Sequence, residues 1–449
     1  MRNDKRSLTL KIKRMGINGE GIAFYNKTLV FIPGALKGEE VCCQIVSRQK
    51  NFMIGRLIRV LKASKERVTP PCPVYDVCGG CQLMHLKYSS QLTLKEDILR
   101  QALKKFKPSG YDDYEIRPTL GMSDATGYRA KLQFQIRKEK GRTKAGLYAP
   151  GSHRLVAIEE CLVQDDVTLR VVTGITRLID RHHVPVYDER NNHGIRTVMT
   201  RRSKKTGETQ VILVVSRALD VTDLVAAIVR EMPEVVTIAT NIQPKKTSDI
   251  YGDKTEIVWG KKMISESVRG ISFSLSPRAF YQLNPDQTEV LYQEVATALE
   301  GSGAQTIIDA YCGVGTIGLS LSNMVTQIRG VDVISEAIAD ARKSASTMGV
   351  GAVYEVGTAE MIIPKWYQEG FRADALIVDP PRAGLDDALL ETILAYPTPT
   401  MIYVSCNASS LARDLRQLAK IYDVAYIQSV DMFPHTARVE AVVKLMLRT

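Results

Sequence analysis

From about residue 303 onward the chain alternates strand-like and helix-like segments, and no other feature of the sequence constrains its fold as strongly. This alternation predicts a mostly parallel sheet with helices on its faces. The segment QTIIDAYCGVGTIGLSLS (305–322) runs strand, glycine-rich turn, helix, and the strand ends at Asp309. About 20 residues later, IRGVDVI ends a second strand at Asp332. In sheets of this class the ligand lies at the carboxyl ends of the strands.

The residues around this turn favour one class of nucleotide ligand over another. Gly313, Gly315 and Gly318 fit the G-x-G-x-x-G pattern, so the glycines alone do not separate a dinucleotide from other adenosine ligands. The carboxylate of Asp309 repels a pyrophosphate but suits a cation. S-adenosylmethionine carries a sulfonium and an ammonium group, and we therefore favour it over NAD. Asp332 is placed to accept hydrogen bonds from the ribose hydroxyls.

Two further strands deliver reactive side chains to the same edge. ADALIVDPPRAGL (373–385) places Asp379 and Arg382 after an apolar strand, and MIYVSCN (401–407) ends at Cys406. An aromatic residue normally follows Asp/Asn-Pro-Pro in methyltransferases of exocyclic amines, so Arg382 argues against that chemistry. A lone cysteine is usually a small core residue, but convergence at one sheet edge makes Cys406 a candidate nucleophile. We assign the rival thiol, Cys312, to packing.

A thiol is needed where the acceptor is carbon 5 of a uracil. That carbon is too electron-poor to attack a sulfonium methyl group directly. A thiolate that adds to carbon 6 turns the ring into an enolate, whose carbon 5 is nucleophilic. The scheme requires one reactive cysteine and one base that later removes the carbon-5 proton.

The positive charge of the chain is concentrated at its N-terminus. The net charge is +11; residues 1–70 hold 15 Lys and Arg against 5 Asp and Glu, so nearly all the excess lies there. A domain biased in this way predicts a nucleic-acid partner. Residues 7–62 alternate short β-rich runs with glycine turns, which predicts a small β-barrel. GINGEG (16–21) is expected to be a hairpin turn, because no phosphate-loop Lys-Ser/Thr follows it.

We expect a soluble cytoplasmic protein with no membrane association. The first residues lack the apolar stretch of a secretory signal, and no apolar run reaches the ~18 residues that span a bilayer.

Four of the eight cysteines have a spacing that suggests a metal site. Cys72, Cys78 and Cys81 follow C-x5-C-x2-C, and Cys161 stands in EECLVQ. In a cytoplasmic protein such spacing favours metal over disulfides. Zinc and a [4Fe–4S] cluster both accept four thiolates, and the spacing does not choose between them.

Taken together, these motifs resemble the RNA uracil-5-methyltransferase family, whose members act on 23S rRNA or tRNA. The resemblance covers nearly the whole chain. KRMGINGEGIAF and its basic surroundings are similar to the family's TRAM domain, and CGGCQLMHL is similar to its iron–sulfur segment. FYQLNPDQ matches the cofactor-binding F-x-Q-x-N segment, and HTARVEAV matches the segment that carries the carboxylate base.

The resemblance implies a multidomain protein. Its parts would be an N-terminal OB-like TRAM β-barrel that binds RNA (1–65), a central α+β domain with the iron–sulfur site (66–270) and a C-terminal Rossmann-like α/β methyltransferase domain (271–449). A helix near 89–106 is expected to pack on the C-terminal domain.

The resemblance also implies the site residues. Cys406 would be the nucleophile and Glu440 the base. Gln282, Tyr311, Asp332 and Asp379 would bind S-adenosylmethionine, and Cys72, Cys78, Cys81 and Cys161 would bind a [4Fe–4S] cluster, with zinc as the alternative. We favour 23S rRNA as substrate because the first domain is strongly basic; tRNA is the alternative, and we expect a monomer.

Three positions depart from the family pattern: Asp332 stands where glutamate is usual, the helix DARKSASTMGV lacks the usual asparagines, and Ala408 replaces a proline. Two other functions compete with the first. A non-catalytic RNA-binding protein is disfavoured by the intact Asp379, Cys406 and Glu440. A cytosine-5 methyltransferase is disfavoured because residues 379–382 contain no second cysteine.

Overall fold

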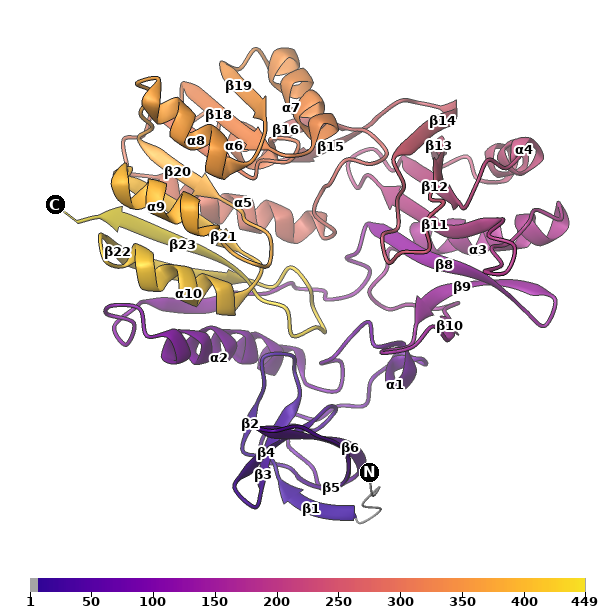
Figure 1. Ribbon diagram of the computed structural model, residues 1–449. Helices are drawn as coiled ribbons and strands as arrows, with labels where there is room; N and C mark the ends of the chain where they lie inside the picture. Colours follow the sequence, from indigo (N-terminus) through magenta and orange to yellow (C-terminus); the bar gives the residue numbers. More distant parts are fainter. Residues whose placement is uncertain (1–6, 449) are drawn as a thin grey trace.

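The computed structural model describes residues 7–448, which form three main sheets (Figure 1). The first sheet contains residues 7–62, in the strand order β1-β5-β6-β4-β3-β2. Its strands are β1 (Ser7–Lys11), β2 (Arg14–Met15), β3 (Gly21–Tyr25), β4 (Thr28–Ile32), β5 (Glu40–Arg48) and β6 (Phe52–Lys62). β2 and β3 pair antiparallel, so the GINGEG segment is the hairpin turn that its sequence predicts. We call these six strands the N-terminal sheet.

The second sheet has seven strands in the order β10-β9-β8-β11-β12-β13-β14, and α3 (Asp166–Arg181) and α4 (Thr222–Glu231) pack on one of its faces. The strands are β8 (Lys131–Glu139), β9 (Arg142–Tyr148), β10 (Leu155–Ala157), β11 (Ile195–Arg202), β12 (Thr209–Val215), β13 (Val235–Ile242) and β14 (Lys254–Gly260). Alternate residues of β8, such as Leu132 and Phe134, are buried beneath the helices. A short helix, α1 (Tyr75–Cys78), precedes this sheet in the chain.

The third sheet has eight strands in the order β19-β18-β17-β20-β21-β23-β22-β7. They are β17 (Thr306–Ala310), β18 (Gln327–Asp332), β19 (Ala352–Val356), β20 (Ala375–Val378), β21 (Thr400–Ser405), β22 (Tyr422–Val430), β23 (Glu440–Leu447) and β7 (Ile116–Leu120). Strands β17 to β21 pair parallel, as the strand–helix alternation predicts. The strand order reverses between β17 and β20, and α/β folds bind ligands at such a switch point.

Helices cover both faces of this third sheet. One face packs against α2 (Tyr88–Phe106), α8 (Ala359–Gln368), α9 (Asp387–Ala395) and α10 (Ala408–Leu418). The other packs against α5 (Pro285–Leu299), α6 (Thr316–Ser320), α7 (Ser335–Met348) and the hairpin of β15 (Ile264–Val268) and β16 (Ile271–Leu275).

Two segments from earlier in the chain belong to this C-terminal body. α2 lies against α10, with Leu94, Ile98 and Leu103 in its core, and Figure 1 shows α2 running along the underside of the body. β7 adds a parallel strand beside β22. Hydrophobic spacing identifies the α2 helix but does not say which body it covers. Within residues 7–448, no helix is long and apolar enough to cross a bilayer.

Candidate active site

Strand register brings Cys406 and Glu440 together, although they are far apart in the sequence. β21 and β23 run antiparallel, and Ser405 pairs with Ala441. Continuing the register by one residue sets Cys406 opposite Glu440 at the edge of the sheet. Glu440 also pairs with Val430 of β22, so a strand lies on each side of its backbone. A strand that returns antiparallel therefore delivers the carboxylate to the thiol.

The Cys406 thiol lies in a partly buried, electrostatically mixed environment. Burial, followed by the nearby carboxylates of Glu440 and Asp379, raises the pKa of Cys406 to about 11, while Arg382 opposes the rise. The free thiol is therefore protonated near neutral pH. Forming the thiolate requires either removal of that proton by a neighbouring base or a change in the surrounding charges when ligands bind.

Glu440 is 4% exposed, and its environment disfavours its charged form. Burial and then the carboxylate of Asp379 raise the pKa of Glu440 to about 8, while Arg382, Lys95 and Arg438 act in the opposite direction. Burial likewise raises the pKa of Asp379 to about 7. Two carboxyl groups with such displaced pKa values beside a cysteine are typical of a reactive site, although ion-pair networks can also produce them.

A hollow of about 600 Å³ opens at Cys406, within the size range of ligand pockets. Arg382 and Arg438 line the hollow. The side-chain oxygen of Asn407 caps α10 by accepting from Ser409 N at 3.0 Å, and its side-chain amide donates to the Arg382 carbonyl at 2.8 Å. Guanidinium groups are suited to binding phosphate oxygens. The sequence alone assigns no role to Arg382 and does not single out Arg438, although Arg438 stands only two residues before Glu440.

The glycine-rich turn after β17 has the geometry of a cofactor loop. Gly315 has φ +76°, and a Cβ atom there would lie 2.7 Å from the Tyr354 hydroxyl, so only glycine fits. Asp332 accepts hydrogen bonds from Gly313 N and Ile334 N, both at 2.9 Å. The carboxylate expected at the ribose position therefore lies directly beside the turn.

Asp309 is fully buried beneath this loop. One of its carboxylate oxygens accepts from Gly318 N at 2.8 Å, and the other, within the described residues, has no hydrogen-bond partner. Burial raises the pKa of Asp309 to about 7. An orphaned buried oxygen in the loop fits a site that is completed by a cationic ligand.

Two of the other expected cofactor residues, Tyr311 and Asp379, directly follow β17 and β20 at the same sheet edge. Tyr311 has φ +62°, and its hydroxyl donates to Glu360 at 2.8 Å. Gln282 is half-buried in the segment before α5, whose N-cap is Asn284, and it does not line the hollow at Cys406. Cys312 is buried in the core on the α5–α7 side, in agreement with the packing role that its sequence position predicts.

The loop 431–439, which leads into Glu440, is held from several directions. Lys95 of α2 forms a buried ion pair with Asp431, and its ammonium donates to the Phe433 carbonyl at 3.1 Å. Asn284 donates to the Met432 carbonyl at 3.2 Å, and Tyr128 to the Pro434 carbonyl at 2.9 Å. Lys95 is not predicted from the sequence, although a lysine within the apolar stripe of a helix is unusual.

His435, in the same loop, has a structural role. Its carbonyl accepts from Gln82 N at 3.0 Å and Leu83 N at 2.8 Å, and its backbone N–H donates to Gln91 at 2.9 Å. The segment that follows Cys81 is therefore hydrogen-bonded to the loop that carries Glu440.

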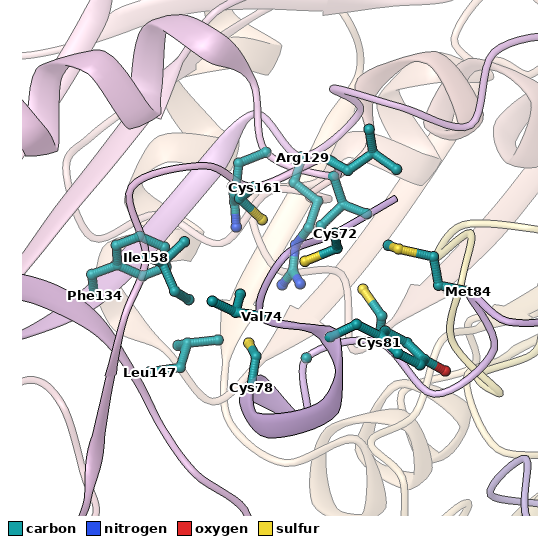
Figure 2. A pocket seen from close by; sticks show the side chains of 15 residues that line it. Cys72, Val74, Cys78, Cys81, Met84, Arg129, Phe134, Leu147, Ile158 and Cys161 are labelled. Carbon is teal, nitrogen blue, oxygen red and sulfur yellow. The ribbon is translucent and has the colours of Figure 1, made fainter. Parts of the chain in front are cut away.

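Cys72, Cys78, Cys81 and Cys161 line one cavity, beside α1 and near the edge of the second sheet (Figure 2). All four thiols are free. Figure 2 shows the guanidinium of Arg129 among them, and the Nε atom of Arg129 is buried without a hydrogen-bond partner in the described part of the chain. Among residues 7–448, however, no three His, Cys, Asp or Glu side chains form a group that could hold a metal ion.

Burial raises the pKa of three of these cysteines, Cys78, Cys81 and Cys161, and neighbouring cysteines raise each of them further. For Cys81 the value is about 12. These three thiols are thus neutral at pH 7, so any metal bound to them would have to displace their protons.

The known proteins that this chain resembles are RNA methyltransferases. Residues 366–448 match the family model for tRNA (Uracil-5-)-methyltransferase. Uncharacterized RNA methyltransferases of Streptococcus pneumoniae and Enterococcus faecalis are 59% and 53% identical to this chain. The alignments cover 98% of this chain in both cases, and 98% and 97% of the relatives. The Pyrococcus abyssi tRNA (uracil-54, C5)-methyltransferase, solved with S-adenosyl-L-homocysteine, is 27% identical with a TM-score of 0.78; the match covers 98% of this chain and 99% of that one.

Proposed function

The chain belongs to the RNA uracil-5-methyltransferase family, an S-adenosylmethionine-dependent enzyme family, and from this premise we propose that it methylates carbon 5 of a uridine through a covalent adduct at Cys406. The observation that carries the proposal is the register of β21 and β23, which sets Cys406 opposite Glu440 at the rim of a hollow. Nucleophile and base are thereby held on two paired strands, which keeps their separation fixed.

In the proposed reaction the Cys406 thiolate adds to carbon 6 of the uracil, and the electron pair of the ring double bond moves to form an enolate. Bound S-adenosylmethionine supplies the methyl group to carbon 5. Glu440 as carboxylate then takes the proton from carbon 5, the ring double bond re-forms, and the bond between Cys406 and carbon 6 breaks. The thiolate is regenerated, so the cysteine is unchanged over the cycle.

The surroundings of Glu440 suit this task. A base works best when its pKa lies near the working pH, and burial together with Asp379 brings the pKa of Glu440 to about 8. Arg382 and Arg438 favour the ionised forms of the neighbouring acids and line the hollow from which RNA would approach. They are therefore suited to contact the phosphates on either side of the target.

We propose that Gln282, Tyr311, Asp332 and Asp379 hold S-adenosylmethionine. The positive φ of Gly315, the position of Asp332 beside the turn and the orphaned oxygen of Asp309 support a cationic adenosine ligand at this sheet edge. Asp332, one methylene shorter than the usual glutamate, is already hydrogen-bonded to Gly313 N, so the ribose would have to share its carboxylate.

We further propose that Cys72, Cys78, Cys81 and Cys161 bind a [4Fe–4S] cluster, with zinc as the alternative. Four free thiols line one cavity, and the unpaired Nε atom of Arg129 fits the negative charge of a thiolate-bound cluster. Since no three of the described side chains already form a metal-binding group, the cysteines would have to draw together when the cluster binds. The bound group would tie α1, the 79–83 segment and Cys161 together.

For the whole chain we propose the domain division 1–65, 66–270 and 271–449. The first part would be an RNA-binding TRAM barrel and the third the methyltransferase domain, with α2 and β7 docked on the third. The basic first domain supports 23S rRNA as substrate. The full-length likeness to an archaeal tRNA methyltransferase supports tRNA as the second candidate. Mass-spectrometric mapping of 5-methyluridine in both RNAs from a deletion strain separates the two.

The mechanism is tested by following the covalent adduct on denaturing gels. Glu440→Gln should add to the RNA and methylate it but fail to eliminate, and a 5-fluorouridine substrate should trap the wild type at the same stage, because fluorine cannot leave as a cation. Cys406→Ala should form no adduct with either RNA. Cys312→Ala is the matched control and should form the adduct normally; an adduct that depends on Cys312 and not on Cys406 would refute the assignment.

A further inference from the structure

We propose that the turn Gly16–Glu20 of the N-terminal sheet is part of the RNA site, and that Ile17 packs against the nucleobase next to the target uridine. This inference rests on the proposed function, since it takes the occupant of the hollow to be an RNA strand with one unstacked uridine.

The turn belongs to the hollow although it lies almost 400 residues before Cys406. Ile17 and Asn18 line the same hollow as Cys406, Arg382 and Arg438. The N-terminal sheet lies below α2 in Figure 1, and Gln101 of α2 donates to the Met15 carbonyl at 3.2 Å. The wall of the hollow is thus shared between the first and third sheets.

Internal hydrogen bonds hold the turn in one conformation. Gly16 N donates to the Glu20 carbonyl at 2.7 Å, and Gly19 N donates to the Gly16 carbonyl at 3.1 Å. The Glu20 carboxylate accepts from the backbone N–H of Asn18 at 3.0 Å and from its side-chain amide at 3.3 Å. The position of Ile17 is therefore defined before any ligand binds.

The turn is also packed against the loop that precedes Glu440. Gly19 has φ +84°, and a Cβ atom there would lie 2.8 Å from Leu83 Cδ2 and 3.2 Å from Ala437 Cβ. The positive φ favours glycine, and any other residue there would have to displace the Leu83 side chain and press on Ala437. The turn therefore stands at a fixed place relative to the reactive pair.

Ile17 is the feature that the fold does not explain. It is 48% exposed at the tip of a turn, where polar residues and glycine are the usual choice. Its neighbours in the hollow include the charged Arg382 and Arg438. An apolar side chain beside two phosphate-binding groups fits a nucleic-acid strand, whose bases are apolar on their faces and whose phosphates are charged.

The chemistry of the reaction identifies the base that Ile17 would meet. The target ring must leave its stack to reach Cys406 and Glu440, and this exposes the face of the neighbouring base. Apolar side chains such as isoleucine cover bases that have lost a stacking partner. Ile17 enters from the N-terminal sheet and not from the edge that holds Cys406, so we assign it to the neighbouring base and not to the target.

Ile17→Ala tests the inference, with Ile58→Ala as matched control. Ile58 belongs to the same sheet, is 52% exposed and does not line the hollow. The probe is a short RNA transcript that spans the uridine mapped in the deletion strain. Covering the exposed half of an isoleucine side chain predicts a Kd about fivefold higher for Ile17→Ala. Ile17→Leu should restore most of the affinity, and Ile58→Ala should match the wild type.

The same variants separate this inference from the proposed function. At saturating RNA carrying 5-fluorouridine, Ile17→Ala should form the adduct at the wild-type rate, with unchanged S-adenosylhomocysteine affinity and melting temperature. Equal Kd values for Ile17→Ala and Ile58→Ala would overturn the inference, as would a slower adduct rate at unchanged Kd. Absence of the adduct in the wild type would instead overturn the proposed function, while the two Kd values would still test the contact of Ile17.

Discussion

Glu440→Gln should stabilise the protein at alkaline pH, because the structure holds this carboxyl group in surroundings that disfavour its charge. The pKa of Glu440 is raised from 4.5 to about 8, first by burial and then by Asp379. An acid whose pKa is raised by folding contributes stability below its unfolded pKa, and that contribution is lost as pH rises from about 4.5 to about 8. Glutamine mimics the neutral acid at every pH.

The magnitude follows from the displacement of the pKa. At about 1.4 kcal/mol for each tenfold change in proton affinity, the raised pKa of Glu440 lowers the free energy of unfolding by about 5 kcal/mol at pH 9 and about 3 kcal/mol at pH 7. Because the unfolding entropy of a chain of 449 residues is about 0.9 kcal/mol/K, the melting temperature of Glu440→Gln should exceed that of the wild type by roughly 5 °C at pH 9, and the two should nearly coincide at pH 5.

The assay is thermal unfolding of both proteins, without ligands, at intervals between pH 5 and pH 9. Glu391→Gln, on the exposed side of α9, is the control and should follow the wild type throughout. A difference between Glu440→Gln and wild type that does not change with pH would mean that Glu440 titrates as in water. That result would refute the desolvation of Glu440, on which the proposed mechanism depends. Loss of stability at a reactive residue is the usual cost of function.

Three further outcomes are expected. Cys72→Ser should lower the iron and sulfide content of anaerobically purified protein, measured by chemical analysis; stoichiometric zinc in the wild type would contradict the iron–sulfur proposal. Neutralising the exposed Lys13 and Arg14, which precede the Gly16–Glu20 turn, to glutamine should reduce the slope of log RNA affinity against log salt by up to about 2, and an unchanged slope would exclude both from phosphate contact. Lys95→Met should lower the free energy of unfolding by about 3–5 kcal/mol, because Asp431 would stay buried without its counter-charge; recovery in Lys95→Met/Asp431→Asn would identify the ion pair as the cause.

Local patterns in the sequence were sufficient to predict the parallel part of the C-terminal sheet and the residues at which its strands end. Thr306 to Ile308, the glycines after them and Asp332 are close in the chain, and their chemistry is carried by residue type and spacing. The same holds for the GINGEG hairpin and for the helix over 89–106. Such features depend on interactions over a few residues, and a single sequence records those directly.

The tertiary structure determines which residues meet when they stand far apart in the sequence. Cys406 and Glu440 face one another only because β23 returns antiparallel beside β21, and no local pattern specifies that register. Lys95, Arg438 and Ile17 reach the same site from a helix, a loop and another sheet. The pKa of Glu440, about 8, likewise depends on burial and on charges such as Asp379 and Lys95 that stand far from it in the sequence, because desolvation depends on everything packed around a group and not on its neighbours in sequence.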